Sequence, residues 1–336
     1  MTTLPARTIG PFSVSAIGLG CMNLNHAYGV PPSPEEGAAL LRHALDAGVT
    51  FFDTAALYGL GESERLVGAT LRHRRSEFTL ASKCVLDARD GKRSLDGSPE
   101  AIAKTLEGSL SRLGVDHIDL YYLHRLDRRV PIEDSVGALA RAVEAGKIGA
   151  IGLSEMSAET IARAHGVHPV AAVQSEYSPT VRNPEIAVLE TCRRLGIGFV
   201  AFSPVARGLL AGAVRSERYA PRDLRAALPR FTGANLAHNL RAVDAFDALA
   251  REIGCTPAQL SLAWVLSRGD DVVPIPGTAS IAHLDENLGA ACVAITPEIG
   301  ARIEAMFAGD AIRGARYTAP MQATVDTETF ADEELA

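Results

Sequence analysis

The sequence predicts a single α/β domain folded as a (β/α)₈ TIM barrel, and two features of the 336-residue chain support this prediction. Helical patterns alternate with short apolar segments along most of the chain, and eight of these segments are candidate strands. Their apolar residues run almost without a break, as in IDLYYL and IGFVAF, which is typical of strands buried on both faces. Eight such strands that alternate with helices point to a closed barrel of parallel strands.

The predicted elements begin with a small hairpin, RTIGPFSV at residues 7–14, which turns at Gly10 and Pro11. We expect this hairpin to plug one end of the barrel. The eight candidate strands follow near residues 16–20, 49–53, 78–82, 117–122, 148–152, 170–174, 197–202 and 271–275. The stretch 205–237, rich in Arg, Ala, Pro and Gly, is the one sizeable irregular insertion in the pattern. It predicts a long functional loop or lid after the seventh strand.

The helices are predicted from their start and stop signals. The first begins with SPEE at residues 33–36, a capping box with proline at the first helical position, and it ends at Gly48. Later starts repeat a capping residue followed by proline, at Ser98, Asn183, Thr256 and Thr296. Later stops fall at Gly114, Gly146 and Gly196.

Composition indicates a globular protein, because 47% of the residues are hydrophobic and 22% are charged. A formal net charge of −7 argues against nucleic-acid binding. Five cysteines without metal-like spacing favour a reducing, cytoplasmic location. The first residues lack the apolar core of a signal peptide, and no segment reaches ~18 apolar residues, so we expect no membrane association. Residues 318–336 are predicted to form a mobile acidic tail, and whether the chain forms a homo-oligomer is left open.

Four polar side chains lie at successive strand ends, where the chemistry of such barrels is found. Asp53 ends the second strand and Tyr58 follows it, while Lys83 ends the third strand and His124 the fourth. Each alone has an ordinary structural explanation, but together they indicate a proton-donating site.

Lys83 is the cation expected to tune this site. Charges about 4 Å apart at an effective dielectric of about 20 interact by about 4 kcal/mol, which predicts a lowering of the pKa of Tyr58 by as much as about three units. Asp53 would keep Lys83 charged, and His124 would donate a second hydrogen bond to the same substrate oxygen. Two donors on one oxygen suit a carbonyl that becomes an alkoxide, and since no side chain donates hydride, a nicotinamide cofactor is implied.

The segment GLGCMN at residues 18–23 begins like a dinucleotide-binding fingerprint, but Asn23 occupies the place of the third glycine. No βαβ unit with the required acidic residue follows at the expected distance, so we reject a Rossmann site. A nucleotide would bind instead at the mouth of the barrel.

The chain resembles the aldo-keto reductases over nearly its whole length. The resemblance rests on GLGCM, FFDTAALYG, LASK, IDLYYLHR, GKIGAIGLSE, VQSEYSP, GFVAFSPVARGLL, RFTGANLAHNL and VVPIPGT, which occur in this order. It is strongest to the bacterial branch that carries GLSE and QSEYS. The resemblance implies an NAD(P)H-dependent reductase of aldehydes or ketones, with Asp53, Tyr58, Lys83 and His124 as its catalytic tetrad.

The resemblance also implies the cofactor site. Ser154 and Gln174 match the residues that hold the nicotinamide carboxamide, and Phe202 matches the aromatic residue on which the ring stacks. The loop at the pyrophosphate matches Ser203, Pro204, Val205 and Gly208, and the pair at the adenine matches Glu286 and Asn287. The remaining expected cofactor-binding residues are Gly20, Cys21, Met22, Asp53, Arg207, Ile275, Gly277 and Ser280.

Two departures from the family pattern stand out. Glu155 occupies a position where many members have Asn, and Ala279 and Ser280 replace the basic residues that usually grip the 2′-phosphate of NADPH. Arg207 and the hydroxyl groups of Thr278 and Ser280 are the candidate replacements. The family's habit favours NADP(H), and NAD(H) stays an alternative.

The expected substrate is a small carbonyl compound or alcohol, and its pocket is predicted to include Asn23, Tyr28, Leu57, Cys84, Leu86 and Arg125. Arg125 is either a ligand for an anionic substrate or a partner in a surface salt bridge. Two other functions are alternatives: a regulatory module that retains the cofactor, and a metal-dependent barrel hydrolase. Nothing in the sequence favours the first, and the lack of HxH or another clustered ligand set argues against the second.

Overall fold

The computed structural model describes residues 4–25, 27–87 and 94–336. Its main sheet has eight parallel strands that follow one another in chain order. They are β3 (Leu19–Gly20), β4 (Phe51–Asp53), β5 (Thr79–Cys84), β8 (Ile118–Leu123), β9 (Ile148–Ser154), β10 (Val170–Glu176), β11 (Gly198–Phe202) and β12 (Val272–Pro274). The first and last strands meet, because the backbone N–H groups of Gly18 and Gly20 donate to the carbonyl groups of Pro274 and Pro276 at 3.0 and 3.3 Å. The predicted (β/α)₈ barrel is confirmed.

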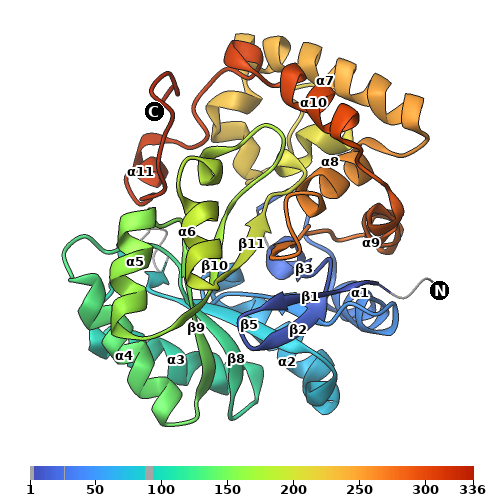
Figure 1. Cartoon of the computed structure of the whole chain (residues 1–336). Helices are drawn as coiled ribbons and strands as arrows, with labels where there is room; N and C mark the ends of the chain where they lie inside the picture. Colours follow the sequence, from blue (N-terminus) through green and yellow to red (C-terminus); the bar gives the residue numbers. More distant parts are fainter. Residues whose placement is uncertain (1–3, 26, 88–93) are drawn as a thin grey trace.

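Helices cover the outside of the strands, as Figure 1 shows. They are α1 (Pro34–Asp46), α2 (Glu62–Leu71), α3 (Pro99–Leu113), α4 (Ile132–Glu144), α5 (Ala158–Val167), α6 (Val188–Leu195), α7 (Gly233–Ile253), α8 (Pro257–Leu266), α9 (Ile281–Leu288), α10 (Pro297–Met306) and the short α11 (Ala319–Gln322). The capping box of α1 forms as predicted, with the N–H of Glu36 bonded to Ser33 and the Glu36 carboxylate bonded to the Ser33 N–H. None of the described helices combines the length and the apolar character that a membrane span requires.

One predicted helix start is wrong. Asn183 begins only a short 3₁₀ turn, η5 (Asn183–Glu185), and α6 begins later, at Val188. Arg182 and Ala187, not Asn183, occupy the N-cap positions of η5 and α6. Nδ2 of Asn183 donates to the backbone oxygen of Glu328, 3.0 Å away, so its side chain contacts a segment far away in the sequence.

Both faces of each strand are apolar because the barrel has an inner and an outer core. In β8, Leu120 and Tyr122 belong to the cluster inside the barrel, whereas Tyr121 and Leu123 pack in the layer between the strands and the helices. This alternation explains the uninterrupted apolar runs in the sequence. Trp264, on α8, is fully buried in the outer layer.

The predicted N-terminal hairpin is formed by β1 (Ala6–Ile9) and β2 (Phe12–Ser15), which pair antiparallel. Ile9 and Val14 belong to the inner cluster, so the hairpin closes one end of the barrel. Gly198 permits this approach, since a Cβ atom there would lie 2.9 Å from Cα of Ile9.

The long insertion after β11 is less irregular than its composition predicts. Residues 205–237 contain three 3₁₀ turns, η6 (Ala206–Ala211), η7 (Leu224–Ala227) and η8 (Pro229–Phe231), and α7 already begins at Gly233. Much of the segment is therefore ordered by local turns, which the sequence pattern did not reveal.

Candidate active site

The four polar residues predicted at strand ends lie together at the carboxyl-terminal end of the barrel. Lys83, on β5, forms an ion pair with Oδ1 of Asp53 at the end of β4. Its Nζ also donates to the carbonyl oxygen of Thr54 at 2.9 Å and to the phenol oxygen of Tyr58 at 3.2 Å. The rings of Tyr58 and His124 meet edge to face with their centroids 5.9 Å apart. The structure thus joins a carboxylate, an ammonium, a phenol and an imidazole in one cluster.

Burial and neighbouring charges together set the charge state of this cluster. Burial is the largest influence on the pKa of Tyr58 and raises that pKa above its ordinary value, while the charge of Lys83 acts in the opposite direction without outweighing it. The expectation that Lys83 lowers the pKa of Tyr58 is therefore wrong for this structure: Lys83 only limits the rise. For Lys83, burial lowers the pKa, but Asp53 and Tyr58 more than offset this and the pKa lies above its ordinary value. At neutral pH Tyr58 is protonated and Lys83 is charged.

A cavity of about 1420 Å³ opens above the cluster. Asp53, Tyr58 and His124 lie in its wall, together with most of the expected cofactor-binding residues. These are Gly20, Met22, Ser154, Gln174, Phe202, Ser203, Pro204, Val205, Arg207, Gly208, Ile275, Gly277, Glu286 and Asn287. The expected substrate-pocket residues in the wall are Asn23, Tyr28, Leu57 and Arg125.

Five expected site residues lie outside the cavity wall among the described residues: Cys21, Lys83, Cys84, Leu86 and Ser280. Lys83 lies behind Asp53 and Tyr58. Cys84 was placed in the pocket incorrectly, because successive side chains of a strand face opposite sides and Cys84 packs in the outer core. Cys21 and Leu86 are likewise buried, and the hydroxyl group of Ser280 caps α9 by accepting from the N–H of His283 at 3.4 Å.

The loop after β11 has an unusual backbone that one ion pair holds in place. Ser203, Ala206 and Arg207 all have positive φ angles, of 50°, 49° and 56°, which residues other than glycine rarely adopt. The Arg207 guanidinium donates two hydrogen bonds to the buried carboxylate of Glu176, at 3.2 and 2.8 Å. Arg207 is thus committed to Glu176, which weakens the idea that it replaces the missing basic residue for the 2′-phosphate.

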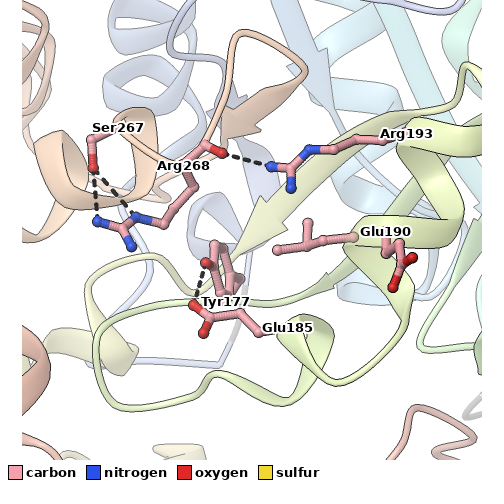
Figure 2. A pocket seen from close by; sticks show the side chains of 7 residues that line it. Tyr177, Glu185, Glu190, Arg193, Ser267 and Arg268 are labelled. Atoms are coloured by element: carbon pink, nitrogen blue, oxygen red, sulfur yellow. Dashed lines mark hydrogen bonds between the residues drawn. The ribbon is translucent and has the colours of Figure 1, made fainter.

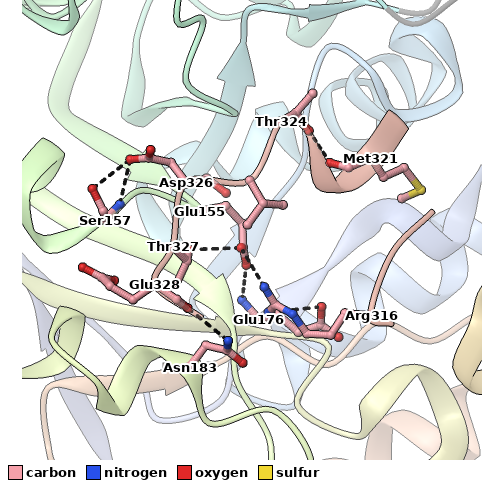
Figure 3. Close-up of polar contacts among 12 residues, drawn as sticks. Glu155, Ser157, Glu176, Asn183, Arg316, Met321, Thr324, Asp326, Thr327 and Glu328 are labelled. Carbon is pink, nitrogen blue, oxygen red and sulfur yellow. Dashed lines mark hydrogen bonds and ion pairs between the residues drawn. The ribbon is translucent and has the colours of Figure 1, made fainter. Parts of the chain in front are cut away.

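The C-terminal segment (residues 316–336), which was not expected to contribute to the site, lies at the rim of the barrel. In this segment Asp326 accepts hydrogen bonds from N and Oγ of Ser157, at 3.0 and 2.9 Å (Figure 3). The Thr327 hydroxyl donates to the buried carboxylate of Glu155 at 3.1 Å. Glu155, one of the two departures from the family pattern, is thereby an attachment point for the C-terminal segment. The predicted mobility of the tail stays a prediction.

Sequence reasoning missed the contribution of this segment to the site. Its residues in the cavity wall are Tyr317, Thr318, Pro320 and Met321. Arg222, Arg225 and His283, from the long insertion and from α9, also line the cavity without having been predicted. No local pattern signals these positions, because they reach the cavity only through contacts between distant parts of the chain.

A smaller cavity of about 400 Å³ lies elsewhere, beside α6 and the end of α8 (Figure 2). Several of its polar side chains have protein partners: the Tyr177 hydroxyl donates to Glu185 at 2.6 Å, and the Arg193 guanidinium donates to the backbone oxygen of Arg268 at 2.6 Å. None of the predicted site residues lines it. Among the described residues there is also no group of three or more His, Cys, Asp or Glu side chains arranged to hold a metal ion.

Comparisons with known proteins agree with this arrangement. A sequence model of the aldo/keto reductase family matches residues 16–307. The aldo-keto reductase yakc [NADP(+)] of Schizosaccharomyces pombe is 44% identical over 323 residues, which cover 94% of this chain and 95% of the relative. A probable aldo-keto reductase 1 of Glycine max is 43% identical, over 91% of this chain and 89% of the relative. These two relatives come from a fungus and a plant, so they do not single out a bacterial branch.

Solved structures of other proteins have the same fold. The glycerol dehydrogenase AKR11B4 of Gluconobacter oxydans superimposes with a TM-score of 0.82 at 29% identity, covering 92% of this chain and 96% of its own. The holo form of the aldo-keto reductase AKR11C1 of Bacillus halodurans has a TM-score of 0.74 at 26% identity, with 91% and 96% of the two chains covered.

Proposed function

The chain belongs to the aldo/keto reductase family, and we propose that it reduces an aldehyde or a ketone to an alcohol, with NADPH as the hydride donor and Tyr58 as the proton donor. One observation carries the proposal: the buried Lys83 ammonium lies between the Asp53 carboxylate and the Tyr58 phenol beneath a large cavity. A purely structural ion pair has no need of a phenol as a third member at the mouth of a cavity.

The cavity fits a dinucleotide. Its volume of about 1420 Å³ exceeds the ordinary size of a pocket for a small ligand. Ser154 and Gln174 offer polar groups for a carboxamide, and the partly exposed ring of Phe202 offers a surface for stacking. Glu286 and Asn287, in the same cavity wall, offer polar groups for the adenine. NADP(H) is favoured because the fission-yeast relative carries NADP(+) in its name, and NAD(H) stays the alternative.

The residues of the chain have distinct parts in the proposed reaction. The chemistry that NADPH supplies when it is bound is the transfer of a hydride to a carbonyl carbon. Tyr58 donates its proton to the carbonyl oxygen, and its raised pKa keeps it protonated until then. His124, whose ring meets the edge of Tyr58, orients the same oxygen. Lys83 stabilises the phenolate left on Tyr58, and Asp53 keeps Lys83 charged.

Steady-state turnover tests the proposal. Purified protein is mixed with NADPH and a panel of aldehydes and ketones, and the consumption of NADPH is compared with the amount of alcohol formed. Equal amounts of oxidised NADPH and alcohol support the proposal. Tight binding of NADPH without reduction of any carbonyl compound would instead support a regulatory module that retains the cofactor.

A cytoplasmic location is also proposed, since all five cysteines are free thiols and three of them are buried.

A further inference from the structure

Arg125 follows His124 at the end of β8 and lies in the cavity wall. Its Nη1 donates to the backbone oxygen of His124 at 2.6 Å and to Oγ of Ser154 at 3.2 Å. Both acceptors are uncharged. A guanidinium has five N–H groups, and the three on Nε and Nη2 donate to no protein atom in the part of the chain that the structure describes. The side chain is half-buried, so its charge is only partly solvated.

The other arginines of the cavity differ from Arg125. Arg207 is paired with Glu176 and Arg225 with Asp223, at 2.8 and 2.7 Å. Arg222 has no ion pair among the described residues, but it is exposed to solvent and belongs to the long insertion. Arg125 is therefore the half-buried arginine of the wall that lacks a carboxylate among the described residues. The sequence left open a surface salt bridge for this residue, and no described carboxylate forms one with it.

The place of Arg125 connects it with the proposed reaction. It adjoins His124 in sequence, and its charge is one of those that act on the Tyr58 phenol. An anion bound by the free edge of its guanidinium would lie close to the carbonyl oxygen held by Tyr58 and His124. Arginine binds carboxylates through paired N–H groups, which makes a carboxylate the chemistry that fits best.

We propose that Arg125 binds a carboxylate of the substrate, so that the preferred substrates are aldehydes or ketones that also carry an acid group. This inference rests on the proposed reductase function and names the substrate class of that site. The competing explanation is that Arg125 only positions Ser154 toward the carboxamide of the cofactor.

Matched substrates separate these explanations. The specificity ratio is the kcat/KM for an aldehyde acid divided by that for its methyl ester, for instance succinic semialdehyde and 4-carboxybenzaldehyde with their esters. We expect wild-type protein to prefer the acids by about 10- to 100-fold and Arg125→Gln to bring the ratio close to one. Arg125→Lys, which keeps the charge but not the fork, should keep part of the preference. Arg42→Gln, which removes an exposed arginine of α1 outside the cavity wall, should leave the ratio unchanged.

A binding measurement makes the inference independent of turnover. Calorimetry on protein saturated with NADP⁺ compares 4-carbamoylbenzoate with its methyl ester, because an amide is neither oxidised nor reduced by a nicotinamide cofactor. Tighter binding of the acid that disappears in Arg125→Gln supports the anion site, even if no carbonyl compound is reduced and the reductase function fails. Equal binding of acid and ester by wild-type protein overturns the inference, as does an equal loss of turnover of both substrates in Arg125→Gln together with weaker NADPH binding.

Discussion

Gln174 donates a hydrogen bond from Nε2 to Oδ2 of Asp53 at 2.8 Å, while Oδ1 of the same carboxylate is paired with Lys83. In the order of the sheet β10 and β4 are four places apart, so this bond crosses the mouth of the eight-stranded barrel. Both oxygens of Asp53 are thereby fixed, and a residue expected at the cofactor is joined to the cluster expected to donate the proton. Such a closed network orients its members more firmly than separate contacts would.

Tyr58→Phe should reduce carbonyl reduction by about 10²- to 10⁴-fold, because it removes the general acid and little else. The phenol accepts one hydrogen bond from Lys83 and its ring contacts His124, and the ring contact survives the change. NADPH binding, followed by the quenching of intrinsic fluorescence, should stay nearly the same. Turnover within a few-fold of wild type would mean that another group donates the proton.

Lys83→Met should abolish turnover and also destabilise the protein. Asp53 is only 2% exposed, and a buried charge that loses its partner costs about 3–5 kcal/mol. Denaturant unfolding measures this loss, and the double variant Asp53→Asn/Lys83→Met should recover part of it because no buried charge is then left unpaired. If the single variant is as stable as wild type, the ion pair is not the buried, unsolvated pair that the structure shows.

The environment of Glu176 predicts that the protein loses stability as the pH falls into the acidic range. Burial raises the pKa of its carboxyl group, but Arg207 and Arg316 outweigh burial and lower the pKa to about 2. A lowered pKa stabilises the folded state above the ordinary value of 4.5, and this stability is lost as the pH falls from there toward about 2. The free energy of unfolding of wild-type protein should therefore decrease below pH 4.5 more steeply than that of Glu176→Gln. Equal slopes in the two proteins would show that Glu176 does not titrate in this way.

Ala279→Lys tests the missing contact to the 2′-phosphate. Ala279 lines the cavity, and the hydroxyl group of neighbouring Ser280 is occupied as the cap of α9. A lysine there should tighten NADPH binding by about 5- to 20-fold and leave NADH binding unchanged, because only NADPH carries the 2′-phosphate. Fluorescence titration of both cofactors measures the two affinities, with Ala279→Gln as the uncharged control. An equal gain for NADH would place the 2′-phosphate elsewhere.

The sequence predicted what depends on local pattern. Strand ends located Asp53, Lys83 and His124, and the capping box at Ser33 located the first helix, because both signals lie within a few residues. Cys84 was assigned to the wrong face of its strand, because an unbroken apolar run does not show which residues face the cavity. The pKa of Tyr58 was wrong in direction because burial depends on the whole fold. Asn183 failed as a helix start, and the partner that its side chain has instead, Glu328, lies 145 residues away, where no local pattern points to it.

The C-terminal segment supplies the last prediction. Asp326 accepts hydrogen bonds from Ser157 and Thr160 and pairs with Arg128 at 2.9 Å, and these contacts hold in place the chain that follows the cavity residues Tyr317 and Met321. Asp326→Ala should loosen the segment, because one substitution removes all of these side-chain contacts and leaves the bond between Thr327 and Glu155 among those that remain. Limited proteolysis should then cleave residues 318–336 faster than in wild-type protein, and the Michaelis constant for substrate should rise as part of the cavity wall is lost.

Asp332→Ala is the matched control, since Asp332 is an exposed acid of the same segment that forms no ion pair among the described residues. It changes the net charge by the same amount without touching the rim of the barrel, so it should be cleaved at the wild-type rate. If wild-type protein, Asp326→Ala and Asp332→Ala are all cleaved equally fast, the tail is mobile in solution, as its acidic composition predicts. Its residues would then form the cavity wall only part of the time, and the Michaelis constant would be insensitive to Asp326.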